Sequence, residues 1–275
     1  MKAGIIGGTG KMGVFFAGVL ERAGWEVAVS GRSTPLTARD LAERSDLVMV
    51  SVPIRETVPV IRAIAPLLRE DQVICDLTSL KVAPVQAMLA SRAEVIGFHP
   101  MFGPGVAGLR NQTIIATPAR CRKETAERLY RTFRAEGARV TVTTPEAHDR
   151  LMAVIQGITH FSTLCMAESM RILGTDIGEA LAATSPVYRI QMDLVGRLLS
   201  QDPALYADIL QMNPETGPAL AAFAKAVRDL RERVESPDPA AFEGFFRENA
   251  GRFREHAPRA LEETDRIIAI LSEQP

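Results

Sequence analysis

The chain opens with MKAGIIGGTGKMG, a glycine-rich turn between a short apolar run and a segment with helical spacing. Glycine loses more backbone entropy on folding than any other residue, so this turn needs a compensating reason, such as close approach of another group to the main chain. Gly8, Gly10 and Gly13 follow G-x-G-x-x-G, the pattern in which a pyrophosphate reaches the backbone at a helix N-terminus. The opening therefore predicts a dinucleotide site. The alternative is a glycine-rich turn in an α/β protein that binds no nucleotide.

Short apolar strands alternate with helical segments through the first half of the chain. We expect strands at residues 3–6, 26–30, 46–52, 72–77, 94–98 and 113–117, and helices at 12–23, 56–68 and 81–90. Nearly continuous apolar strands separated by helices are typical of a parallel sheet that is covered on both faces. The expected fold class is α/β, with an N-terminal, doubly wound, Rossmann-type parallel sheet.

Strand signals largely disappear after about Pro145. Apolar residues then recur at helical spacing over residues 148–173, 185–200, 218–234 and 239–271. We therefore expect two domains, a dinucleotide-binding Rossmann domain over residues 1–147 and an all-helical C-terminal domain over residues 148–275.

The bulk composition excludes several classes of partner. The chain carries 32 basic and 33 acidic residues, so no strong field attracts nucleic acid or an anionic membrane. No apolar stretch reaches the roughly 20 residues that span a bilayer, and Met1 is not followed by a signal-peptide pattern. Cys75, Cys121 and Cys165 lie too far apart for a metal site or a disulfide framework. We expect a cytoplasmic protein without a metal, with all three cysteines reduced and buried.

The end of the second strand indicates which nucleotide binds. NAD enzymes usually place Asp or Glu there to bind the ribose hydroxyls, whereas this chain has Ser30, Gly31, Arg32 and Ser33. Arg32 is suited to a bidentate contact with a 2′-phosphate, and Ser30 and Ser33 to hydrogen bonds, so NADP is favoured over NAD. The alternative is an exposed loop arginine without a ligand. The other residues expected to contact the cofactor are Thr9, Lys11, Met12, Val52 and Pro53.

Chemistry is expected at the carboxyl edge of the parallel strands. Two segments end there: TSLK, which begins at Thr78, and HPMFGP, which begins at His99. Histidine suits proton transfer near neutral pH, and the hydroxyl of Ser79 is suited to orienting the imidazole. His99 and Ser79 are therefore the catalytic candidates, and a structural histidine at a strand end is the alternative.

Five segments together resemble the prephenate dehydrogenases, the oxidoreductases of tyrosine biosynthesis. They are GFHPMFGP, TSLK, QGITHF from Gln156, SPVYRIQMDLVGRL from Ser185, and QDPALYADI from Gln201. The resemblance extends over essentially the whole chain and is strongest to the dehydrogenase portion of the bifunctional bacterial enzymes. It leaves no room for a chorismate mutase domain or a C-terminal regulatory domain.

The resemblance implies an oxidative decarboxylation that converts prephenate to 4-hydroxyphenylpyruvate. The hydroxyl-bearing ring carbon gives a hydride to NAD(P), the hydroxyl loses its proton to His99, and the ring carboxylate leaves as carbon dioxide. By similarity, Arg197 holds the ring carboxylate. Lys81 is a second anion contact by its place on the TSLK turn, while Gln156 and His160 either line the substrate pocket or pack at the domain boundary.

Several alternatives remain open at this point. Arogenate and a 4-amino analogue of prephenate share the reacting ring, and family members pair into homodimers through the helical domain. A 3-hydroxyacid or imine-type reductase and a noncatalytic NADP sensor are rival functions from other classes. His148 and His256 are expected to be ordinary surface or boundary residues.

Overall fold

The computed structural model describes residues 1–273, which divide into two compact units. The first unit comprises Met1–Ile155 together with Ala204–Glu215. The second comprises Gln156–Pro203 and the described residues from Thr216 onward. The first unit therefore takes in a short segment of the C-terminal half in addition to the expected Rossmann region.

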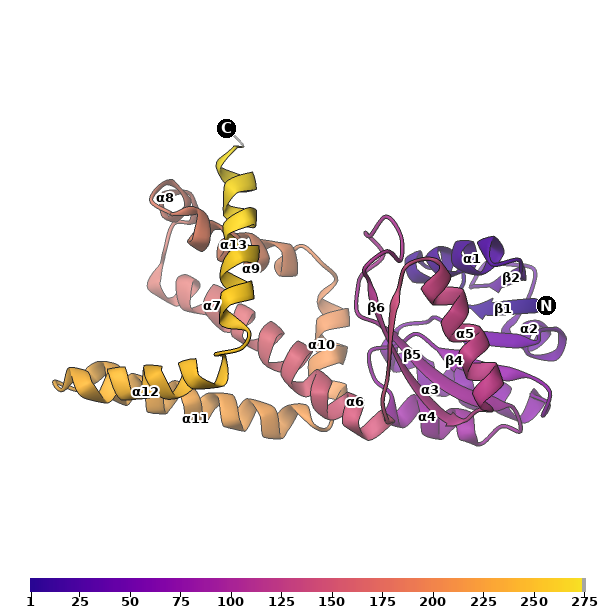
Figure 1. Cartoon of the computed structure of the whole chain (residues 1–275). Coiled ribbons are helices and arrows are strands. Elements are labelled where there is room, and N and C mark those ends of the chain that lie inside the picture. Colours follow the sequence, from indigo (N-terminus) through magenta and orange to yellow (C-terminus); the bar gives the residue numbers. More distant parts are fainter. Residues whose placement is uncertain (274–275) are drawn as a thin grey trace. The chain divides into compact units, whose positions relative to one another are not determined.

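A seven-stranded sheet organises the first unit, in the order β2-β1-β3-β4-β5-β6-β7 (Figure 1). The strands are β1 (Lys2–Ile6), β2 (Glu26–Ser30), β3 (Leu47–Val50), β4 (Val73–Asp76), β5 (Glu94–Pro100), β6 (Thr113–Arg120) and β7 (Arg139–Val142). The helices are α1 (Lys11–Arg22), α2 (Ala38–Arg44), α3 (Ile54–Ile64), the short η1 (Ala65–Leu67), α4 (Val82–Leu89), α5 (Lys123–Ala135), α6 (Pro145–Met152) and α10 (Pro203–Met212). The strand order changes direction between β1 and β3, which creates a crevice at their carboxyl ends.

The α/β fold class is confirmed, with one correction to the sheet. All neighbouring strands are parallel except β5 and β6, which are antiparallel. Residues 101–112 join these two strands without a helix, and a parallel crossover needs a longer connection. The sequence pattern did not predict four elements of this unit, namely α2, α5, α10 and β7.

Both faces of the sheet are packed, as a doubly wound fold requires. Within β3, Leu47 and Met49 pack on the side covered by α1 and α5, and Val48 and Val50 pack on the side covered by α2, α3 and α4. This alternation follows from the twofold side-chain period of a strand. The sheet therefore provides a rigid base for the residues at its carboxyl edge.

The segment 204–215 is fixed to the first unit by polar and apolar contacts. The Arg55 guanidinium of α3 donates to the Asp208 carboxylate of α10 at 2.5 Å, and Ile209 packs with Ile54 and Leu80. The Asn213 side-chain amide donates to the backbone oxygen of Asp149 at 2.8 Å. These contacts place α10 beside the carboxyl edge of the sheet.

The second unit is helical. It contains α7 (Thr159–Leu173), α8 (Ile177–Ala182), α9 (Pro186–Leu199), α11 (Thr216–Glu235), α12 (Pro239–Arg252) and α13 (Ala257–Ser272), and the π-helical segment η2 (Ala153–Ile158) joins α6 to α7. Helices α11 and α12 run side by side (Figure 1). The single helical stretch expected over residues 239–271 is two helices, because Pro258 fits only in the first turn of α13.

Many apolar side chains of the second unit remain exposed. Within the described residues, only Val195 and Leu198 of this unit belong to the buried apolar set, whereas Ile172 and Leu173 are 70% and 79% exposed. Cys165 is also exposed and Cys121 is half-buried, so the expectation that all three cysteines are buried was wrong for these two. A search of the described helices for one long and apolar enough to cross a membrane found none.

Candidate active site

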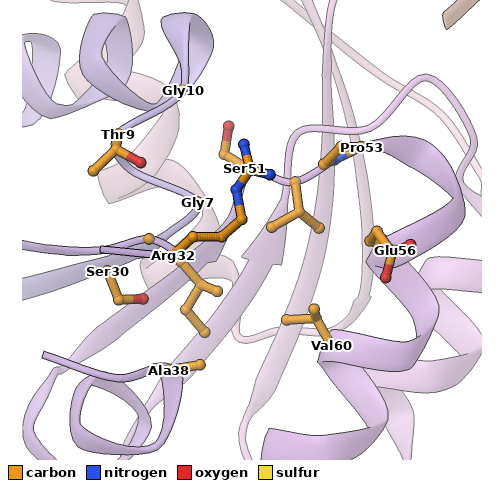
Figure 2. A pocket seen from close by; sticks show the side chains of 13 residues that line it. Gly7, Thr9, Gly10, Ser30, Arg32, Ala38, Ser51, Pro53, Glu56 and Val60 are labelled. Carbon is orange, nitrogen blue, oxygen red and sulfur yellow. The ribbon is translucent and has the colours of Figure 1, made fainter. Parts of the chain in front are cut away.

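A cavity of about 720 Å³ lies where β1 and β3 end (Figure 2). Its walls come from the turn after β1, the end of β2, the residues after β3 and the start of α3. The lining residues are Ile6, Gly7, Thr9, Gly10, Ser30, Gly31, Arg32, Ala38, Ser51, Val52, Pro53, Glu56 and Val60. This is the crevice in which a doubly wound sheet binds its ligand.

The glycine turn has the geometry of an anion cradle. Gly7 has a φ of +80°, and a Cβ there would lie 2.2 Å from the Ser51 backbone oxygen, so only glycine fits. The tight turn is thus made at Gly7, one residue before the G-x-G-x-x-G pattern begins. A Cβ on Gly13 would lie 2.5 Å from the Gly7 oxygen, and one on Gly8 would lie 2.6 Å from Val29. Gly8 and Gly13 therefore permit close packing behind the cavity and do not line it.

The start of α1 is open toward a ligand. Gly10 is its N-cap residue and makes no side-chain cap, and a Cβ added there would meet only the Gly7 oxygen, at 3.3 Å. Uncapped N–H groups at a helix N-terminus, next to a turn without side chains, bind phosphate well. The residues present therefore fit a pyrophosphate.

The segment after β2 contributes the arginine Arg32 to the lining of this cavity. Arg32 is exposed, and Figure 2 shows its side chain pointing into the cavity. Ser30 also lines the cavity, while Ser33 is exposed and lies outside the lining. The sequence analysis did not anticipate Glu56, which reaches the same cavity from α3.

A second cavity of about 350 Å³ adjoins the first. Both are lined by Gly10 and by residues 51–53. The second cavity also includes Lys11 and Met12 from α1, Ser79 from the TSLK turn, and His99 with the loop that follows it. A ligand long enough to follow the shared residues would extend from Arg32 to His99.

His99 is buried at the end of β5, and its imidazole pairs with a second histidine. His99 Nδ1 lies 2.8 Å from His148 Nε2, and His148 Nδ1 lies 2.7 Å from Asp149 Oδ1. Burial depresses the pKa of His99 well below its ordinary value, and the neighbouring His148 and Lys81 lower it further. His99 is therefore a neutral base at neutral pH.

Two sequence expectations about this site need correction. His148 is fully buried beside His99, so its interpretation as a surface or boundary residue was wrong. Ser79 lines the same cavity as His99, but within residues 1–273 the hydrogen bond of the His99 ring is made to His148. The only sequence signal for His148 was its spacing of four from Met152, which places both on the inner face of α6.

Lys81 also differs from its expected role as an anion contact. Its side chain is 0% exposed, and Nζ donates to Asp76 Oδ2 at 2.5 Å and to the Phe98 backbone oxygen at 2.7 Å. Burial lowers the pKa of Lys81, and the Asp76 carboxylate opposes that shift. Lys81 is an internal cation that joins β4 to β5, and a ligand does not reach it.

The remaining candidates, Gln156, His160 and Arg197, belong to the second unit. Gln156 lies in the π-helical segment, and π-helical turns are frequent at functional sites. Burial lowers the pKa of His160 on α7. Arg197 lines a cavity of about 890 Å³ beside α7 and α9, and its guanidinium makes no ion pair with any residue that the structure describes.

Comparison with known proteins agrees with this geometry. Residues 17–142 match the family model described as "Prephenate dehydrogenase, nucleotide-binding domain", and residues 144–274 match "Prephenate dehydrogenase, dimerization domain". The chain is 34% identical to a probable arogenate/prephenate dehydrogenase of Methanocaldococcus jannaschii, over 98% of this chain and 65% of that protein. It is 31% identical to the T-protein of Haemophilus influenzae, over 96% of this chain and 70% of that protein.

A solved structure supports the same fold. The crystal structure of prephenate dehydrogenase from A. aeolicus, in complex with hydroxyphenyl propionate and NAD+, aligns with a TM-score of 0.75 at 20% identity. The alignment covers 93% of this chain and 98% of that one. On the sequence matches to both halves, the chain belongs to the prephenate dehydrogenase family.

Proposed function

We propose that the protein is an NADP-dependent dehydrogenase that decarboxylates prephenate, or a close cyclohexadienyl analogue, oxidatively in the cytoplasmic synthesis of tyrosine. One observation carries the proposal: the cavity at Arg32 and the cavity at His99 share Gly10 and residues 51–53. The glycine turn would hold the phosphates of a dinucleotide along this path, and His99 lines the cavity that would receive its nicotinamide.

Three regions of the first unit would hold the cofactor. Thr9, Gly10 and the first turn of α1 hold the pyrophosphate, and Val52 and Pro53 pack along the dinucleotide. Arg32, with Ser30 and Gly31, receives a ribose 2′-phosphate, which favours NADP over NAD. The nicotinamide, when bound, accepts the hydride from the substrate ring.

His99 accepts the proton of the ring hydroxyl as the carbonyl forms. A general base must lack the proton it is to accept, and burial keeps the His99 imidazole neutral. Ser79 lines the same cavity and is placed to bind the substrate hydroxyl or the base. Loss of carbon dioxide then makes the ring aromatic, so the oxidation is strongly downhill.

The second unit supplies the substrate contacts in this proposal. Arg197 binds the ring carboxylate, because it lines a cavity and makes no ion pair with the residues that the structure describes. Gln156 and His160 line the substrate pocket. The second unit also pairs two copies of the chain, as supported by its match to a dimerization domain and by its exposed apolar side chains.

Arogenate is the second candidate substrate. The M. jannaschii relative is described as acting on arogenate or prephenate. The two compounds differ only in the side chain, which carries an amino group in arogenate and a keto group in prephenate. A 4-amino analogue of prephenate differs at the reacting position.

Steady-state assays test the function. The purified protein is offered prephenate, arogenate and the 4-amino analogue, each with NAD and with NADP, and reduced nicotinamide and carbon dioxide are measured. We expect equal amounts of the two products, with prephenate and NADP the most efficient pair. Absence of cofactor reduction with all three acids would overturn the proposal, and oxidation of NADPH by an imine or 3-oxoacid would favour a reductase.

A further inference from the structure

We propose that His148 is a positioning residue, which holds His99 in the tautomer whose Nε2 is free to accept the substrate proton. The proposal rests on the proposed function for its kinetic consequences, but the arrangement itself can be tested without a substrate. Three groups form a continuous chain: the Asp149 carboxylate, the His148 ring and the His99 ring.

The chain begins at a fixed acceptor. The Asp149 carboxylate accepts hydrogen bonds from the backbone N–H of Lys81 at 2.8 Å and of Val82 at 3.0 Å. Its side chain is 3% exposed, so these two donors at the start of α4 hold it in one orientation. A carboxylate so held only accepts, and the His148 Nδ1 at 2.7 Å must therefore carry a proton.

The second link follows from the chemistry of a neutral imidazole. With Nδ1 protonated, Nε2 of His148 carries a lone pair and is an acceptor. The His99 Nδ1, 2.8 Å away, must then donate to it, which leaves His99 Nε2 without a proton. Both rings are buried and meet edge to face at an interplanar angle of 68°, so neither exchanges its partner for water.

If the donor and acceptor of the His99–His148 hydrogen bond were exchanged, His99 could not act as the base. If His148 donated from Nε2, His99 would accept at Nδ1, and a neutral His99 would carry its proton on Nε2, the position that must be empty. Asp149 therefore decides which ring nitrogen donates in each hydrogen bond, although two hydrogen bonds separate it from the reacting atoms. During the reaction, the proton from the substrate hydroxyl binds to His99 Nε2, and the Nδ1–H bond to His148 then stabilises the imidazolium.

Nitrogen NMR of the histidine rings tests the arrangement directly. The chain contains only four histidines, so full-length protein with 15N-labelled histidine gives a small set of signals, and H256Q and H160Q assign two of them. At neutral pH we expect both His99 and His148 to be protonated at Nδ1 and bare at Nε2. A proton on Nε2 of His99 would overturn the proposal, whether or not the protein oxidises any cyclohexadienyl acid.

Kinetics of two variants test the consequence. H148L removes the acceptor, while the amide oxygen of H148Q can still accept from His99 Nδ1. We expect kcat to fall about 10- to 100-fold in H148L with the Kd for NADP unchanged, and to recover in part in H148Q. H256Q changes an exposed residue and serves as the matched control. Wild-type kcat in a folded H148L would contradict the proposal.

The pH profile separates positioning from packing. The titratable groups around His99 are His148 and Asp149 from α6, Asp76 from β4 and Lys81 before α4. H148L removes the acceptor of the His99 Nδ1–H bond, which stabilises the His99 imidazolium, so the acid limb of kcat should move to lower pH in H148L. If H148L does not fold, the NMR measurement on wild-type protein decides the question.

Discussion

Lys81 and Arg32 carry the same charge but lie in opposite environments. Lys81 is fully buried, forms an ion pair with Asp76 and donates a hydrogen bond to the Phe98 carbonyl. Arg32 is exposed and points into the cofactor cavity. A buried ion pair is weak evidence for added stability, but removing one partner leaves a costly unpaired charge. Only the arginine is available to a ligand, and that difference assigns their roles.

Arg32→Ala tests the choice of nucleotide. The variant loses a charge-assisted contact with the 2′-phosphate, which NAD lacks. We expect KM for NADP to rise about 10- to 100-fold, since such contacts contribute about 1.5–3 kcal/mol, with KM for NAD little changed. Arg39→Ala, on the exposed ion pair with Glu43, is the matched control. Equal effects of R32A on both nucleotides would refute the assignment.

The burial of His99 predicts how stability depends on pH. The folded-state pKa of His99 is depressed, whereas in the unfolded chain it titrates at about 6.5. As pH falls below that value, the unfolded state binds a proton that the folded state does not, so the free energy of unfolding decreases. Urea denaturation between about pH 7 and about pH 5 should show this loss, and His99→Asn should reduce it by about 1 kcal/mol per pH unit. An identical pH slope in both proteins would contradict the inference.

At the scale of elements, Gly13 allows helix α1 to pack closely against the turn that follows β1. Gly13 is buried, and a Cβ there would meet backbone atoms of Gly7 and Gly8 at 2.5 and 2.6 Å. Gly18, in the same helix, would meet only the end of the Arg22 side chain, at 3.3 Å. The two positions differ in packing but share the same helical environment.

This contrast yields a paired prediction. Gly13→Ala should displace α1, lower the free energy of unfolding by about 1–3 kcal/mol and weaken NADP binding. Gly18→Ala should be neutral or stabilising by up to about 1 kcal/mol, because alanine favours the helix. Urea denaturation and NADP titration of both variants provide the measurements. Equal destabilisation by the two substitutions would show that the Gly13 contact does not fix the helix.

The sequence predicted an element correctly where its apolar pattern was strong. Strand β1 matched its apolar run, because a strand buried on both faces has a continuous apolar pattern. Strand β7 was not predicted, because Arg139–Val142 lies at the sheet edge and is mostly exposed, so its apolar pattern is weak. The direction of β6 depends on the loop over residues 101–112, whose glycines and proline predict a turn but not the direction in which the next strand runs.

The site was predicted in part for the same physical reason. His99 lies at the end of β5 and Arg32 lies just after β2, so topology alone brings them to the carboxyl edge. His148 lies 49 positions from His99, and Asp76 meets Lys81 inside the protein. Such pairings depend on tertiary packing, and a single sequence records the residues but not the contacts between them.

At the scale of the whole molecule, we expect the chain to self-associate through its helical unit. Apolar side chains on several of its helices are exposed, including Val187, Tyr188 and Leu261. Exposed apolar surface of this kind is typical of an interface in a homodimer. Analytical ultracentrifugation should give twice the chain mass of 29.9 kDa at micromolar concentration. A monomer under these conditions would contradict the pairing.

Substitution of the base tests the central claim most directly. His99→Asn removes the proton acceptor and retains a polar side chain of similar size. Turnover of prephenate with NADP should fall by about 10²- to 10⁴-fold, the usual contribution of a general base, while the Kd for NADP from calorimetric titration stays within about twofold. Turnover close to the wild-type rate in a folded His99→Asn protein would contradict the assignment of His99 as the base.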